Sequence, residues 1–298
     1  MGRVARIDAT GCACLTAAGP VRADLAGPLT PVAGDWALLA GDQLIGLLPR
    51  QSTVVCGRDR RDVHGEVVAA NAELVFVVQA FPLLGAVERT ERLLALAAAT
   101  GAVPVLVLSQ VDRATDPDEV AATLAELAIH AQPLGTWPGV EVVAVSTAPG
   151  HPAGAGLDRL RALLCPETPL ARAEPARFRR PTVGRVRAQA GRVWARAGRT
   201  AAVVGPPGSG KSSLVDKLSG TRSVPSKTGS ILVPLPGGGA VIDTLARGAG
   251  RSRESPGDWL AERYVTRLRI ERRADWRAAA ATASSLGRRR ARPAAGNA

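Results

Sequence analysis

The segment that decides how this sequence is interpreted runs from residue 205 to residue 212 and reads Gly205-Pro206-Pro207-Gly208-Ser209-Gly210-Lys211-Ser212. It fits the G-x-x-x-x-G-K-[ST] pattern of a phosphate-binding loop. An apolar run at 200–204 precedes it and a helix-forming stretch at 212–219 follows it, so the strand-loop-helix context that the pattern requires is present. The alternative is a chance match in a glycine-rich chain, against which this context argues.

The residue types of this loop suit the binding of phosphate groups. Glycines let the backbone fold around an anion, so that successive N–H groups and the N-terminus of the next helix face it. Lys211 would neutralise the β- and γ-phosphates, and the Ser212 hydroxyl would hold Mg2+. We therefore predict that residues 205–213, including Ser213, bind the phosphates of a purine nucleotide.

The sequence around this loop predicts an α/β domain from residue 66 onward. Apolar runs at 74–79, 103–108, 141–145, 200–204, 231–235 and 240–242 predict strands, and the stretches 87–100, 117–131 and 212–219 predict helices. Continuous Val and Leu runs without alternation are typical of a parallel sheet that is covered on both faces. We predict that this domain extends from 66 to 252.

Residues 1–65 predict a different architecture. Short β segments at 12–16, 36–39 and 44–48 are separated by the turn signals Gly19-Pro20, Gly27-Pro28, Gly34-Asp35 and Gly41-Asp42. This pattern favours a small β-barrel. Two further segments are set apart by composition: an insert at 166–200, rich in Pro, Arg and Ala, and a basic tail at 253–298, with a predicted helix from about Trp259 to Ala280 and a disordered end at 288–298.

Polar residues follow two of the predicted strands. Ser109-Gln110-Val111-Asp112 follows the strand at 103–108, and Ser146-Thr147 follows the strand at 141–145. Ligands of open α/β sheets bind just past the carboxyl ends of the strands. A carboxylate there can accept hydrogen bonds from N1–H and the exocyclic amine of guanine, so Asp112 is the candidate for base recognition. The alternative is that Asp112 caps the helix that follows.

Asp243 ends the apolar run at 240–242, which lies downstream of Lys211 as the Mg2+-binding carboxylate of nucleotide hydrolases does. We predict that Asp243 helps to hold Mg2+. A turn-initiating Asp at a strand end is the alternative.

The formal net charge is +12, and the excess is concentrated in two blocks. Residues 171–199 carry nine arginines against Glu174 alone, and residues 263–298 carry ten against Glu271 and Asp275. Such blocks attract polyanions, with RNA or DNA as the usual partner of a cytoplasmic protein. A solvated arginine-rich surface that reflects a GC-rich coding bias is the alternative.

Other features favour a cytoplasmic location. Arg3, Arg6 and Asp8 interrupt any secretory signal, and the uncharged run from 93 to 111 is split by Gly101 and Pro104, which argues against a membrane span. The four cysteines are too scattered for a disulfide framework or a zinc finger.

The order of these motifs carries a family resemblance, because the base motif at 109–112 and its companion Ser146-Thr147 precede the phosphate loop instead of following it. The chain resembles the circularly permuted ribosome small-subunit-dependent GTPase A family, over about residues 30 to 275 without the insert. Further matching segments are Val32-Ala33-Gly34-Asp35-Trp36, Leu47-Leu48-Pro49-Arg50, Val68-Ala69-Ala70-Asn71, Glu91-Arg92-Leu93-Leu94, Val233-Pro234-Leu235-Pro236-Gly237-Gly238-Gly239 and Asp243-Thr244.

The chain also departs from the family pattern at several motifs. The family base motif N-K-x-D is Ser109-Gln110-Val111-Asp112 here, which predicts weaker guanine binding. The first switch keeps only Thr228 as a Mg2+ ligand, and Leu245-Ala246 replaces the Pro-Gly of the second switch. No cysteine or histidine follows Cys165, so the family's C-terminal zinc site is predicted to be missing.

The resemblance implies an N-terminal OB-like β-barrel, a circularly permuted P-loop GTPase domain and a basic helical C-terminal tail. It implies a monomeric GTPase that binds GTP, GDP and Mg2+, with Lys211 and Asp243 in catalysis and Ser212, Thr228 and Asp243 on the metal. Its partner would be the small ribosomal subunit and its rRNA. One alternative is a degenerate nucleotide-binding module with little hydrolysis, and another is an unrelated P-loop ATPase.

Overall fold

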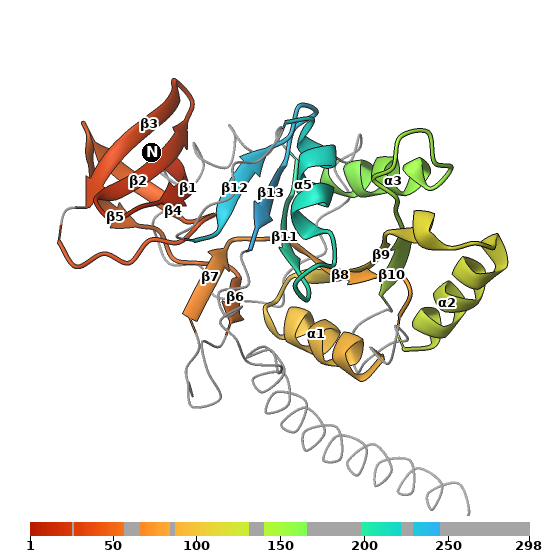
Figure 1. The fold of residues 1–298 in the computed structure, drawn as a ribbon. Helices are drawn as coiled ribbons and strands as arrows, with labels where there is room; N and C mark the ends of the chain where they lie inside the picture. The colour runs from red at the N-terminus through yellow and green to blue at the C-terminus, as the bar shows by residue number, and fades with distance from the viewer. Residues whose placement is uncertain are drawn as a thin grey trace, which may run out of the picture.

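A computed structural model of the protein describes residues 1–25, 27–56, 66–83, 87–130, 140–165, 198–221 and 229–244 (Figure 1). Several predictions lie outside these residues: the role of Thr228, the interior of the insert, the helix at 259–280 and the tail at 288–298. They stay predictions.

The first five strands form a closed barrel, drawn in red at the left of Figure 1. The strands are β1 (Gly2–Ile7), β2 (Gly11–Thr16), β3 (Gly19–Leu25), β4 (Trp36–Ala40) and β5 (Gln43–Leu47), in the order β1-β2-β3-β5-β4. β1 pairs with β4 and closes the barrel, and β3 pairs with β5 in parallel. This order is that of an OB-like barrel, so the predicted class of the N-terminal part is confirmed.

The barrel core is made of small and medium side chains, because five strands enclose little space. Its buried members are Val4, Cys12, Cys14, Ala23, Ala37 and Leu44. The Sγ atoms of Cys12 and Cys14 lie 3.6 Å apart, and burial raises the pKa of the Cys14 thiol to about 12. These two cysteines therefore act as small apolar core residues.

Two strands of the barrel, β1 and β3, were not predicted from the sequence. The charged residues of β1, Arg3 and Arg6, break its apolar pattern, although Arg3 is buried. Gly19-Pro20 was predicted to be a turn, which is wrong: both residues open β3, where Pro20 pairs with Leu15. A proline is tolerated there because the first residues of a strand need not donate to the ladder.

A separate hairpin follows the barrel. Its strands β6 (Thr53–Cys56) and β7 (Glu66–Ala70) pair in antiparallel fashion. The predicted domain boundary at residue 65 therefore falls between two paired strands, and the hairpin connects the barrel to the larger sheet.

The larger sheet has six strands in the order β10-β9-β8-β11-β13-β12. Their bounds are β8 (Leu74–Ala80), β9 (Val103–Ser109), β10 (Glu141–Ala144), β11 (Thr200–Val204), β12 (Ile231–Pro234) and β13 (Ala240–Asp243). All neighbours pair in parallel except β12, which is antiparallel to β13 at the edge. The predicted parallel α/β sheet is confirmed.

Helices cover both faces of this sheet. They are α1 (Val87–Ala99), α2 (Pro117–His130), α3 (Gly154–Leu164) and α5 (Lys211–Ser219). Leu94 of α1 and Leu127 of α2 share one core with Val75 and Val77 of β8, whereas α3 and α5 share another with Phe76. This alternation explains why the strand reads as a continuous apolar run.

Helix α3 was not predicted. It begins Gly-Ala-Gly, and its N-cap Ala153 offers no side chain to the free N–H groups, so the sequence lacks a start signal. Tertiary packing of Leu157, Leu160 and Leu164 stabilises it. Among the described helices, none is long and apolar enough to cross a membrane.

A buried polar cluster, which we call the barrel seam, joins the barrel to the sheet. It comprises Arg3, Gly34, Trp36 and Asn71. The Arg3 guanidinium lies 4.9 Å from the centre of the Trp36 ring and donates to the carbonyl oxygens of Gly34 (3.2 Å) and Asn71 (2.8 Å). The Asn71 amide donates to the Gly34 oxygen at 3.0 Å. Burial lowers the pKa of Arg3, while the charges of Glu73 and Asp35 oppose that shift.

Gly34 is the tightest point of the barrel seam. Its φ is +93°, and a Cβ there would lie 2.1 Å from the Ala70 oxygen and 2.9 Å from Cδ1 of Ile242. No other residue fits. Because Ile242 precedes Asp243 on β13, the barrel packs directly against the strand that carries a predicted Mg2+ ligand.

The residues that flank the insert also lie together. The Arg199 N–H donates to the Leu164 oxygen at 2.6 Å, and the Cys165 thiol donates to the Gly238 oxygen at 2.5 Å. The Ala240 N–H donates to the Arg199 oxygen at 3.0 Å. The described residues on either side of the insert, Cys165 and Arg199, therefore lie close together, beside the β12–β13 turn.

Candidate nucleotide-binding site

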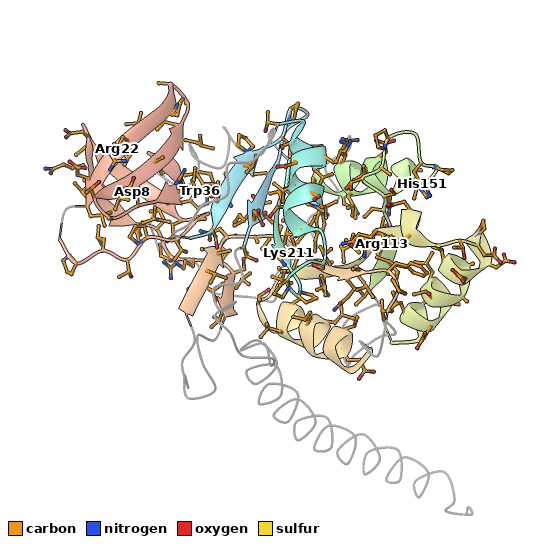
Figure 2. The ribbon with its side chains drawn as sticks, viewed as in Figure 1. Asp8, Arg22, Trp36, Arg113, His151 and Lys211 are labelled. Atoms are coloured by element: carbon orange, nitrogen blue, oxygen red, sulfur yellow. The ribbon has the colours of Figure 1, made fainter. Side chains whose placement is uncertain are left out.

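The predicted site residues lie at the carboxyl ends of the parallel strands. Ser109 ends β9, Ser146 lies just past β10, the phosphate loop follows β11 and Asp243 ends β13. This edge is where ligands bind in open α/β sheets. Figure 2 shows Lys211 in the middle of the molecule, at the start of α5, with Arg113 of the neighbouring loop beyond it.

The phosphate loop has the predicted shape. Gly210, with φ +82°, immediately precedes α5, whose first residue is Lys211. Lys211 is 8% exposed, and its ammonium donates to the carbonyl oxygens of Gly205 (2.9 Å) and Pro206 (2.7 Å). The ammonium thus lies over the loop, at a helix N-terminus, where an anion is favoured.

Two predicted metal ligands lie side by side. The Ser212 hydroxyl donates to Oδ2 of Asp243 at 2.9 Å. Burial raises the pKa of Asp243, and the bond from Ser212 and the charge of Lys211 oppose the shift. A hydroxyl beside a carboxylate is a set of hard oxygen donors that fits Mg2+. The third predicted ligand, Thr228, is outside the described residues.

The predicted base-binding residues also come together. Asp112 lies in the short 3-10 helix η1 (Val111–Arg113), and its Oδ1 accepts a hydrogen bond from the Ser146 hydroxyl at 2.7 Å. Thr147 follows, half-buried. Asp112 does not cap α2. Asp116, the residue just before the helix, accepts a hydrogen bond at 2.9 Å from the N–H of Asp118 in the first turn.

The base-binding loop is hydrogen-bonded to the phosphate loop. The Ser109 hydroxyl donates to the backbone oxygen of Ser209 at 2.6 Å. The backbone oxygen of Gln79, at 3.1 Å, is a second acceptor for the same hydroxyl. The Gln110 side-chain amide donates to the Gly208 oxygen at 2.7 Å. No local sequence pattern predicts these contacts, because the paired residues are about a hundred positions apart.

Comparisons with known proteins agree with this geometry. The small ribosomal subunit biogenesis GTPase RsgA of Streptomyces avermitilis is 33% identical over 273 residues, which is 84% of this chain and 62% of that protein. RsgA of Xanthomonas oryzae pv. oryzae is 28% identical over 71% of this chain and 50% of its own length. The chain is a relative of the RsgA proteins. No protein-family model matches it.

Two solved structures share the fold of this chain. YjeQ from Thermotoga maritima superposes with a TM-score of 0.55 at 17% identity, covering 82% of this chain and 73% of that one. YloQ, described as a circularly permuted GTPase, gives 0.51 at 16% identity, with coverages of 85% and 72%. These matches bear out an N-terminal OB-like barrel followed by a circularly permuted GTPase domain. The chain spans 50 to 62% of the length of the two RsgA proteins.

In this RsgA relative, buried polar atoms without a partner gather at the same edge. Within the described part of the chain they are Nε2 of Gln79, Oγ of Ser209 and Oδ1 of Asp243. Gln79 was not predicted; it lies near the end of β8, next to β11. Buried polar groups are normally paired, so a cluster of unpaired ones marks a place where a ligand or water is expected.

Proposed function

We propose that this protein binds GTP with Mg2+, hydrolyses it, and acts on the small ribosomal subunit in the cytoplasm as a monomer. The observation that carries the proposal is the convergence of three groups at one sheet edge. These are the Lys211 loop, the Ser212–Asp243 pair and the Asp112–Ser146 pair. The sequence similarity to RsgA proteins supports the same proposal.

The chain's own residues would act mainly by positioning and charge. When nucleotide binds, the Lys211 ammonium would leave the carbonyl oxygens of the loop and bind the β- and γ-phosphates instead. The N–H groups of the loop would bind the other phosphate oxygens. When bound, Mg2+ would neutralise charge that develops on the phosphates. Ser212 and Asp243 would hold it, and Asp243 must be ionised to do so, so its raised pKa makes metal binding weaker in acid.

Guanine recognition would rest on Asp112. Its carboxylate is held by Ser146 at Oδ1, which fixes the orientation in which it meets N1–H and the exocyclic amine. Adenine does not offer these donors in the same arrangement. The proposed base contact therefore predicts a preference for guanine over adenine nucleotides.

A panel of nucleotide affinities tests this part of the proposal. GTP and GDP should bind at least about tenfold more tightly than ATP, which corresponds to one charge-assisted hydrogen bond. The affinity for GTP should fall when Mg2+ is chelated. Equal affinities for GTP and ATP would reject the guanine assignment and favour an unrelated ATPase.

The proposed partner is the rRNA of the small subunit. The described residues on either side of the arginine block at 171–199 are joined by the hydrogen bond from the Arg199 N–H to the Leu164 oxygen, so a short linker can replace the block and should spare the site. Replacing residues 167–196 by a short Gly-Ser linker should weaken salt-dependent binding to small subunits and leave GTP affinity unchanged. The variant with Arg267, Arg269, Arg272 and Arg273 changed to Ala should weaken it further.

Sedimentation with small subunits gives the readout. The parent should co-sediment when loaded with a non-hydrolysable GTP analogue and less so with GDP. Equal sedimentation in both states, or none at low salt, would reject the partner assignment and leave the arginine blocks as solvated surface.

A second candidate is a nucleotide-binding relative that does not hydrolyse GTP. It is favoured by the second switch, where Leu245-Ala246 replaces Pro-Gly directly after Thr244, whose hydroxyl is held by the Val203 oxygen. Single-turnover hydrolysis with small subunits present separates the two. Tight GTP binding without phosphate release would favour this candidate.

A further inference from the structure

One side of helix α5 carries a second acidic residue close to the proposed Mg2+ site. Ser212 and Asp216 are four residues apart, so they lie one turn apart on the same side of the helix. The apolar residues Leu214, Val215 and Leu218 are buried in the core between α5 and the sheet. Asp216 is half-buried, so it lies at the margin of that core, on the side of the helix that Ser212 shares.

The side of α5 that carries Ser212 and Asp216 is next to the end of β13. Helix α5 packs against both β12 and β13, and the Ser212 hydroxyl donates to Oδ2 of Asp243 at 2.9 Å. Burial raises the pKa of Asp243, and the negative charge of Asp216 adds to that rise, whereas Ser212 and Lys211 oppose it. Two carboxylates therefore act on each other at the end of β13.

The Asp243 carboxylate is incompletely paired. Asp243 is 8% exposed, and its Oδ1 has no hydrogen-bond partner within the part of the chain that the structure describes. A second carboxylate nearby makes this arrangement more costly without a cation, because like charges repel each other in a partly buried place. A divalent cation removes both costs, since carboxylate oxygens are among its preferred ligands.

The chemistry of Mg2+ gives a nearby carboxylate a specific task. Protein-bound Mg2+ keeps several water molecules, because it gives up its hydration shell reluctantly. Groups that accept hydrogen bonds around the first layer of ligands orient those ligands and tune the metal site. A carboxylate one helical turn from Ser212 is suited to accept from such a water molecule.

We propose that Asp216 is a positioning residue for Mg2+, which accepts a hydrogen bond from a metal-bound water molecule and adds negative charge to the Ser212–Asp243 site. The inference rests on the proposed nucleotide function and extends its metal site. The phosphate-loop pattern ends at Ser212, so no motif marks Asp216.

This role predicts opposite effects on metal and nucleotide. Asp216→Asn should weaken metal binding to the GDP complex by about tenfold, the lower end of the range for a lost outer-shell partner. In EDTA the same variant should bind GDP about twofold more tightly than the parent, because one negative charge near the phosphates is gone. A residue that only supports the fold would weaken both.

The experiment uses the full chain and Mn2+ as a paramagnetic substitute for Mg2+. Electron paramagnetic resonance measures Mn2+ binding to the GDP complex, and a fluorescent GDP analogue measures nucleotide affinity in EDTA. Asp216→Ser also removes the charge and should reproduce the loss, whereas Asp216→Glu keeps the charge and should stay within about threefold of the parent. Glu126→Gln removes an exposed charge on α2, which packs on the other face of the sheet, and should bind like the parent.

The outcomes separate this inference from the proposed function. A parent that binds GDP and Mn2+, with Asp216→Asn and Asp216→Ser variants that bind Mn2+ equally well, would overturn the role of Asp216 and leave the proposed function standing. Equal losses of Mn2+ and of GDP in EDTA, or an Asp216→Glu variant as weak as Asp216→Asn, would also overturn it. A parent that binds no GDP would overturn the proposed function and this role together.

Discussion

The barrel seam and the carboxyl edge of the large sheet are both buried and polar, but their polar atoms are satisfied to different degrees. In the barrel seam, the Arg3 guanidinium has two carbonyl acceptors and an aromatic ring, and the Asn71 amide shares the Gly34 oxygen with it as an acceptor. At the nucleotide edge, side-chain atoms of Gln79, Ser209 and Asp243 are buried without partners in the described structure.

This difference separates two uses of buried polar groups. A fully paired cluster fixes the relative position of two parts of a fold, because any other arrangement leaves charges and amides unsatisfied. A cluster with unpaired polar atoms costs stability, and it is retained where a ligand supplies the missing hydrogen-bond partners. Substitutions in the barrel seam should therefore affect stability, and substitutions at the nucleotide edge should affect binding.

The largest effect is expected at Gly34. The Gly34→Ala variant places a methyl group 2.1 Å from the Ala70 oxygen at a positive φ, so the free energy of unfolding should fall by about 4 kcal/mol, combining overpacking with left-handed strain. Urea denaturation measures this. Gly41→Ala, also at a positive φ but in open space, is the control and should cost only about 1 kcal/mol. Similar losses in both would show that the barrel seam is not tight.

The next effect concerns the nucleotide edge. Lys211→Ala should weaken GTP binding by about 3 kcal/mol, the value of a hydrogen bond to a charged group at the upper end of its range, with little change in thermal stability. Lys217→Ala, which changes an exposed side chain in the last turn of the same helix, should bind GTP like the parent. Calorimetric titration and thermal unfolding test both variants. Unchanged GTP affinity in Lys211→Ala would contradict the proposal that the loop at 205–213 binds the nucleotide phosphates.

A smaller effect is expected for base discrimination. Asp112→Asn should reduce the difference between GTP and ATP affinities by about 2 kcal/mol, because it replaces a charged acceptor of the guanine N–H groups. The Ser146 hydroxyl can still donate to the Asn oxygen, so the loop should keep its structure. A variant that discriminates as well as the parent would mean that the base is read elsewhere.

The smallest effect is a gain of stability. The pKa of Asp243 is raised by burial above its ordinary 3.8, so the folded chain holds this proton more tightly than the unfolded chain does. The buried carboxylate costs stability once the pH rises above the raised pKa, and the cost vanishes below 3.8. Asp243→Asn should therefore slightly stabilise the nucleotide-free protein at neutral pH, with no gain in acid.

Denaturation at two pH values measures this gain, and GTP binding with Mg2+ measures the functional loss that should accompany it. A destabilised Asp243→Asn variant at neutral pH would mean that the carboxylate supports the fold and is not held ready for a metal ion.

Much of the nucleotide edge was predictable from local patterns. The strand at 200–204 was predicted with its observed ends, and the other five strands of the large sheet agree within a residue or two at each end. The phosphate loop, Asp243 and Asp112 follow apolar runs, so their place at the carboxyl edge could be inferred. Helix α3 and strand β1 could not be predicted in this way. Gly154 and Gly156 weaken the helical pattern of α3, and the buried Arg3 interrupts the apolar pattern of β1.

The sequence by itself determined the residue types at the site, which follow from short motifs, and the permuted order of these motifs, which is given directly by their positions along the chain. Tertiary structure alone decided that Ser109 and Gln110 reach the phosphate loop, that Gln79 is buried there unpaired, and that Gly34 meets Ile242. The physical reason is that these contacts join residues on different strands and loops. Their geometry is set by strand order and side-chain packing, which no local pattern encodes.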